Sequence, residues 1–116
     1  MSLSEIFPDN FNYLCEKLPE YAGSADAADY GKGMIRAEQV AECLTALRAK
    51  LTPDRNRFLF PQTERALYAL KRLKSFFADS ECSSLTAGDA YVFGAYLEVE
   101  AKKIRDIAVE IDNPEE

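Results

Sequence analysis

The chain has 116 residues, of which 47% are hydrophobic and 29% are charged, with a formal net charge of −6 at pH 7 and no histidine. This composition fits a single domain over residues 1–116, and no run of about 18 apolar residues predicts a membrane span. The absence of histidine removes the commonest general base and every Ser–His or Cys–His dyad, so we expect no enzyme activity.

The cysteines and the N-terminus indicate a cytoplasmic protein without cofactors. Cys15, Cys43 and Cys82 are odd in number and far apart, and no C-x-x-C pair is present. This pattern predicts reduced thiols rather than a metal site. The first residues contain neither the basic region nor the apolar region of a signal peptide.

The first predicted helix is short and covers about residues 9–18. Phe11, Leu14 and Leu18 share one of its faces, and Pro19 is expected to end it.

A long connection is expected next. Residues 21–33 contain three glycines, with only small or polar residues between the tyrosines, which favours a flexible loop. A helical turn at residues 25–29 is the alternative interpretation. The second helix follows near residues 35–51, where four apolar residues recur at spacings of 4, 3 and 4.

The second half of the chain predicts two longer helices. One covers about residues 61–78, with Pro61 in the favoured first position. Thr86-Ala-Gly-Asp89 resembles a capping box and opens a fourth helix of roughly 25 residues. Residues 90–100 also suit a strand, but the cap and the continuing helical spacing favour a helix enclosed by neighbours. With a frayed acidic tail at 112–116, the prediction is an all-α, antiparallel bundle of about four helices, the first short and the last long.

Charge is sorted into three blocks along the chain. Residues 1–33 have a net charge of −4, residues 34–78 of +5 and residues 79–116 of −7. Long-range charge of this kind acts on partner choice and on association rate, not on the fold.

The acidic ends of the chain suggest a binding surface. Asp106 and Glu110 are like charges four residues apart, near the negative pole of the fourth helix, and neither placement favours the helix. A local rule broken without an evident gain suggests a functional residue, although a solvated helix end is the other interpretation. We expect the carboxylates from both ends of the chain to converge into one negative surface. The candidate partner-binding residues are Asp26, Asp29, Asp106, Glu110, Asp112, Glu115 and Glu116, with Tyr21 and Tyr30 as aromatic contacts.

These features favour a non-catalytic binding module, acting as an antagonist, inhibitor or adaptor that docks a basic partner protein. The partner would be a nucleic-acid-binding protein or a toxin. In size and charge the chain resembles the small acidic inhibitor proteins of bacteria and phages, which include toxin-immunity proteins and proteins that mimic DNA. The likeness covers no alignable residues and carries over no sites.

Two alternative functions stay open. The first is nucleic-acid binding through the basic segment 48–74, although most of its cations also suit the ends of helices and its phenylalanines suit a core. The second is self-association through one flank of the fourth helix, at Tyr91, Val92 and Val99. The nucleic-acid candidates are Arg55, Arg57, Arg65 and Tyr68.

Glu100 is the one carboxylate that falls within an apolar stripe. A buried carboxylate needs a partner, so we expect an ion pair with an arginine of the basic block or an edge position that reaches water. A tuned acid beside a pocket is the functional interpretation.

Overall fold

The computed structural model describes residues 3–24, 26–79 and 81–112. These residues form one short 3₁₀-helix and four α-helices, and no strand, so the prediction of an all-α bundle is confirmed. Residues 90–100 are helical, which settles the alternative between helix and strand. The elements are η1 (Leu3–Ile6), α1 (Phe11–Ala22), α2 (Ala27–Lys50), α3 (Leu59–Ala78) and α4 (Ala87–Asp112).

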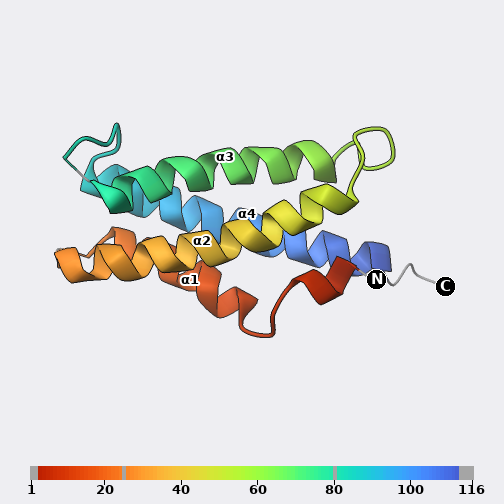
Figure 1. Ribbon diagram of the computed structural model, residues 1–116, viewed down its shortest axis with the longest axis horizontal. Coiled ribbons are helices and arrows are strands. Elements are labelled where there is room, and N and C mark those ends of the chain that lie inside the picture. The colour runs from red at the N-terminus through yellow and green to blue at the C-terminus, as the bar shows by residue number, and fades with distance from the viewer. Residues whose placement is uncertain (1–2, 25, 80, 113–116) are drawn as a thin grey trace.

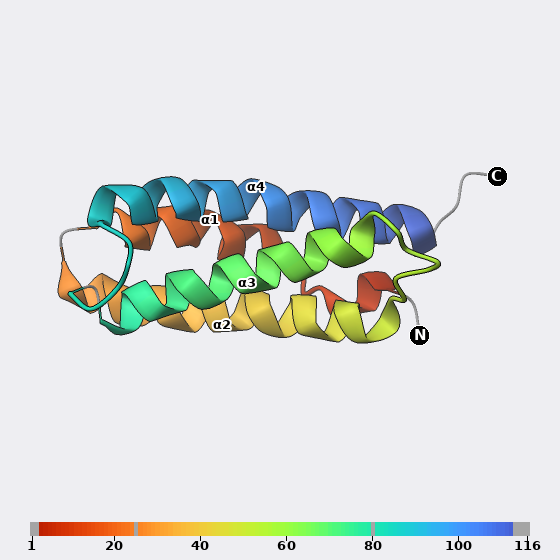
Figure 2. The same cartoon turned by 90° about the horizontal axis from the view of Figure 1, so that it is seen from above.

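The four α-helices lie lengthwise in a rod of 49 × 26 × 19 Å. Each helix runs antiparallel to the one before it, so α2 and α4 point in the same direction (Figures 1 and 2). Both α1 and α3 pack against α2 and α4, and they therefore occupy opposite corners of the bundle. Because α1 is short, η1 takes its place farther along and packs against the same two helices.

The core is formed by the apolar faces of the four α-helices. Leu44 and Leu47 of α2, Leu73 of α3, and Leu97 and Ile104 of α4 have no solvent exposure. Burial of these side chains is the main favourable term for the fold. At the start of α4 the backbone N–H of Asp89 donates a hydrogen bond to Thr86 Oγ1 at 3.1 Å, so the expected cap residue is in place.

The prediction of a flexible loop over residues 21–33 is wrong. Helix α1 continues to Ala22 and α2 already begins at Ala27. The glycines suggested a loop, but Gly33 is buried within α2 beneath the ring of Phe77, where an added Cβ would lie 2.5 Å from the ring. Packing against the ring of Phe77, and not turn geometry, favours glycine at this position.

Pro19 does not end the first helix but lies inside it. A proline within a helix removes one backbone hydrogen bond and usually breaks the helix. Here the backbone of Pro19 packs against Gly94 of α4, where an added Cβ would meet Pro19 Cα at 2.8 Å and Pro19 N at 2.9 Å. The close packing of α1 on α4 offsets the local loss and lets the helix continue.

Candidate functional site

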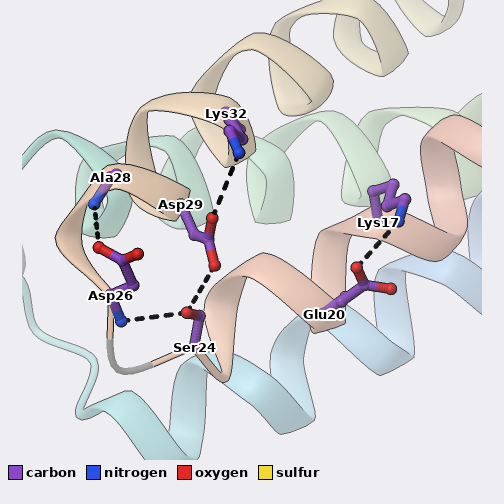
Figure 3. Close-up of polar contacts among 7 residues, drawn as sticks. All are labelled: Lys17, Glu20, Ser24, Asp26, Ala28, Asp29 and Lys32. Carbon is purple, nitrogen blue, oxygen red and sulfur yellow. Dashed lines mark hydrogen bonds and ion pairs between the residues drawn. The ribbon is translucent and has the colours of Figure 1, made fainter.

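The acidic residues at the start of α2 form a helix cap. Figure 3 shows Asp26 accepting a hydrogen bond from the backbone N–H of Ala28 at 3.0 Å, while its own N–H donates to Ser24 Oγ at 3.0 Å. The Ser24 hydroxyl in turn donates to Asp29 Oδ2 at 2.7 Å, and Lys32 Nζ lies 3.7 Å from the other oxygen of Asp29. The Asp26 carboxylate therefore caps the exposed N-terminus of α2, while the Asp29 carboxylate is held in the first turn by Ser24 and Lys32.

Replacing Asp26 with alanine is therefore expected to lower the free energy of unfolding by about 1 kcal/mol, because α2 loses its capping acceptor. Asp26→Asn, which keeps an acceptor oxygen, should retain most of that stability. Urea denaturation of the two variants measures the difference. Equal loss in both variants would show that the negative charge, and not the cap, is what matters here.

The two acidic sets lie at opposite ends of the rod. Asp106 and Glu110 are near the end of α4, whereas Asp26 and Asp29 stand at the start of α2, and these helices are parallel (Figure 1). For these four residues, the expectation of one convergent negative surface is therefore wrong. The antiparallel path through α3 brings α4 back to the end where α2 began, so α4 finishes at the far end.

Asp106 and Glu110 are both exposed, and Asp106 Oδ1 lies 3.3 Å from the guanidinium of Arg105. The side chain of Asp112 and the whole of Glu115 and Glu116, and with them the expected frayed tail, lie outside the described residues.

The two tyrosines expected as loop contacts belong to helices and pack against the core. The ring of Tyr30 meets Phe76 edge-on at 5.2 Å, and the ring of Tyr21 lies 5.7 Å from Lys17 Nζ. Both are half-buried, so their first role is packing.

Among the residues that the structure describes, the acidic ends of the chain do not neutralise the basic segment 48–74. Within the described part of the chain, the ion pairs join Lys17, Lys32, Lys102, Lys103 and Arg105 to nearby carboxylates. No cation of segment 48–74 pairs with a described carboxylate. These unpaired cations are Arg48, Lys50, Arg55, Arg57, Arg65, Lys71, Arg72 and Lys74.

Part of this block faces a groove between α3 and α4. The groove has a volume of about 630 Å³ and combines aromatic walls with charged rims. On α3, positions 61, 65, 68 and 72 follow each other at spacings of 4, 3 and 4, so they form one row on the helix. The small side chain of Ala69 lies between the walls. The principal lining residues are Pro61, Arg65, Tyr68 and Arg72 from α3, and Phe93 and Tyr96 from α4.

Contacts among Phe93, Tyr96 and Arg72 fix the positions of these side chains in the groove. Phe93 and Tyr96 stack with their centroids 6.3 Å apart, and the guanidinium carbon of Arg72 lies 5.3 Å from the centroid of Phe93. Arg72 Nη2 also lies 3.5 Å from the hydroxyl oxygen of Ser84. Tyr68 is 66% exposed and Tyr96 is 44% exposed, so both rings are accessible to a partner.

The four nucleic-acid candidates do not come together. Arg65 and Tyr68 line the groove, whereas Arg55 and Arg57 stand on the connection before α3. Phe58, which we expected in the core, is 84% exposed. Phe58 immediately precedes α3, which begins at Leu59, and its ring faces solvent.

Sequence reasoning missed Arg72, Phe93 and Tyr96 as site residues. The signal for Phe93 and Tyr96 was the excess of aromatic and apolar residues at the start of α4, which we interpreted as a helix enclosed on every side. That interpretation is wrong, since Tyr91, Val92 and Tyr96 are all exposed. These apolar and aromatic side chains lie on the surface of α4 instead of in the core.

Glu100 lies at the edge of its stripe, which is the second of the two expected arrangements, and it has no arginine partner among the described residues. Gln62 Nε2 donates to its carboxylate at 3.2 Å and Lys103 Nζ lies 3.8 Å away, and neither partner is an arginine. Its side chain keeps 19% exposure, so the position is a stripe edge that reaches water.

Across residues 3–24, 26–79 and 81–112, no helix is long and apolar enough to cross a bilayer, and no cluster of three potential metal ligands occurs. The three cysteines are free. Comparison of the chain with protein-family models, curated proteins and solved structures gave no significant match. Function is therefore inferred from residues and geometry alone.

Proposed function

We propose that this chain is a non-catalytic protein-binding module whose main docking surface is the groove between α3 and α4. The observation that supports the proposal is the meeting of two exposed tyrosines, Tyr68 and Tyr96, with two arginines, Arg65 and Arg72, that pair with no described carboxylate. Tyrosine and arginine dominate the energetic centres of protein interfaces.

The chemistry of the lining supports binding over catalysis. Glu64 is the one carboxylate of the groove, and no thiol lines it. Tyrosine rings give a large rigid contact area at low entropic cost, and guanidinium groups add directional hydrogen bonds. A module of this kind acts as an antagonist or adaptor by covering or joining partner surfaces.

A pulldown with matched variants tests the proposal. The immobilised protein is expected to retain a host partner that Tyr68→Ala/Tyr96→Ala loses, with an affinity loss of at least about 100-fold for two hot-spot residues. Tyr13→Ala is the control, because Tyr13 is 46% exposed and stands on α1, away from the groove. Equal retention by the wild type and the double variant would refute the groove as docking surface.

Docking of a basic partner by acidic residues is a second candidate, supported by the exposure of Asp106 and Glu110 on the end of α4. Asp106→Lys/Glu110→Lys should weaken such a complex and leave the melting temperature nearly unchanged. If this variant loses the partner while Tyr68→Ala/Tyr96→Ala keeps it, the acidic end of α4, and not the groove, is the docking surface.

Self-association is the third candidate, because Val92 and Val99 are exposed on α4 with Tyr96 between them at helical spacing. Light scattering measures the molecular mass in solution. A strict monomer at high concentration excludes this candidate.

A further inference from the structure

We propose that the occupant of the groove is an amphipathic α-helix of the partner, with two carboxylates seven residues apart and apolar side chains between them. The inference depends on the proposed function of the groove and names the chemistry of its ligand. Three observations support it: the spacing of the arginines, the position of the tyrosines and the length of the groove.

The separation of the two groove arginines sets the expected separation of the two carboxylates on the ligand helix. Arg65 and Arg72 stand seven residues apart on α3, which is two helical turns or about 10 Å. Neither pairs with a carboxylate of the described chain, and Arg72 is steadied by Phe93 at 5.3 Å. Guanidinium groups bind carboxylates through paired hydrogen bonds, so each arginine suits one acidic side chain of a ligand. On a ligand helix alongside α3, residues i and i+7 have the same separation.

The two groove tyrosines indicate that the ligand residues between the two carboxylates are apolar. Tyr68 lies between the two arginines in the row on α3, and Tyr96 faces the groove from α4. On a helix, positions i, i+3, i+4 and i+7 share one face. A ligand with acids at the outer two positions and apolar residues at the inner two would place each group opposite its counterpart.

The length of the groove suits a helix. The row from Pro61 to Arg72 covers about 16 Å along α3, or three turns of a ligand helix. Helix-in-groove recognition uses this same set of anchor positions.

The observations favour an acidic helix over a nucleic acid. A phosphate backbone needs a continuous track of cations, but Glu64 lies on the groove beside Arg65 and interrupts that track. A short helix needs only two charges and an apolar centre, which the groove supplies.

Fluorescence anisotropy with defined probes tests the inference. The first probe is a labelled alanine- and glutamine-based peptide of about 18 residues with the face Glu-x-x-Leu-Leu-x-x-Glu. Its matched partners have lysine in place of both glutamates, or the same glutamates moved off the apolar face. The wild type is expected to bind the first probe at least about tenfold more tightly than either partner at low salt.

Protein variants identify the contacts. Arg65→Gln/Arg72→Gln should lose at least about tenfold in affinity for the first probe. Lys71→Gln/Lys74→Gln removes the same charge from α3 outside the groove lining and should change the affinity by less than about twofold. Arg65→Glu/Arg72→Glu should reverse the preference and bind the lysine peptide. Melting temperatures check that each variant is folded.

The contrary outcomes distinguish an error about the ligand from an error about the groove as docking surface. Equal binding of the glutamate and lysine peptides, both lost in Tyr68→Ala/Tyr96→Ala, would overturn the acidic helix and support the groove. Binding of no peptide would overturn the helix ligand, while the pulldown decides the function independently. Tighter binding of a single-stranded RNA of about 20 nucleotides, lost in Arg65→Gln/Arg72→Gln, would replace the helix with a nucleic acid.

Discussion

Replacing Gly94 with alanine is expected to lower the free energy of unfolding by about 3 kcal/mol. The new Cβ would lie 2.8 Å from Pro19 Cα, 2.9 Å from Pro19 N and 3.1 Å from the carbonyl carbon of Leu18. All three atoms belong to the backbone of α1, so no side chain can rotate away and the two helices have to separate. Overpacking of a well-filled interior has a cost of this size. Urea denaturation followed by circular dichroism measures the change.

Gly88→Ala is the matched control, since it makes the same change in the same helix. An added Cβ at Gly88 has no neighbour within 4 Å. That variant should gain up to about 1 kcal/mol, because alanine favours a helix more than glycine does. If Gly94→Ala is as stable as Gly88→Ala, the close approach of α1 and α4 is not a feature of the folded protein.

The second large effect concerns pH. Burial raises the pKa of the Cys15 thiol from 9.0 to about 12, with smaller opposing effects from charged neighbours such as Lys102. The folded state therefore holds the thiol proton at a pH where the unfolded chain releases it. This contribution to stability is complete below pH 9 and is lost as the pH rises toward 12, by about 1.4 kcal/mol per pH unit.

Cys15→Ala removes this titration and therefore serves as the reference for the wild type. The free energy of unfolding of the wild type should fall more steeply than that of Cys15→Ala between pH 9 and 11, whereas the two curves should run parallel between pH 6 and 8. Because other groups titrate in both proteins, the difference between the curves isolates Cys15. Parallel curves over the whole range would show that the thiol ionises as readily in the folded protein as in the unfolded chain.

Much of the fold could be predicted from local patterns. The stripe of Leu44 and Leu47 and the cap at Thr86 each depend on residues within a few positions of one another, and both are present as expected. Pro19 and Gly33 were misinterpreted for one common reason. Each has a local meaning, as helix breaker or loop former, that a contact from a distant helix overrides.

The candidate site could be predicted only in part. Arg65 and Tyr68 were identified as binding candidates because they belong to the basic segment 48–74. Their counterparts on α4, Phe93 and Tyr96, lie more than twenty positions away in the sequence, and only the antiparallel pairing of α3 with α4 brings them together.

By itself, the sequence determined the number of α-helices, the buried stripe of the second helix and how charge is divided along the chain, because hydrophobic period and composition are local properties. The tertiary structure alone decided where those charges meet. It placed Asp26 and Asp29 at one end of the bundle and Asp106 and Glu110 at the other, and it left Arg65 and Arg72 without an ion pair to any described carboxylate, beside the tyrosines of a groove. The direction in which each helix returns along the bundle sets these distances, and no short stretch of residues encodes it.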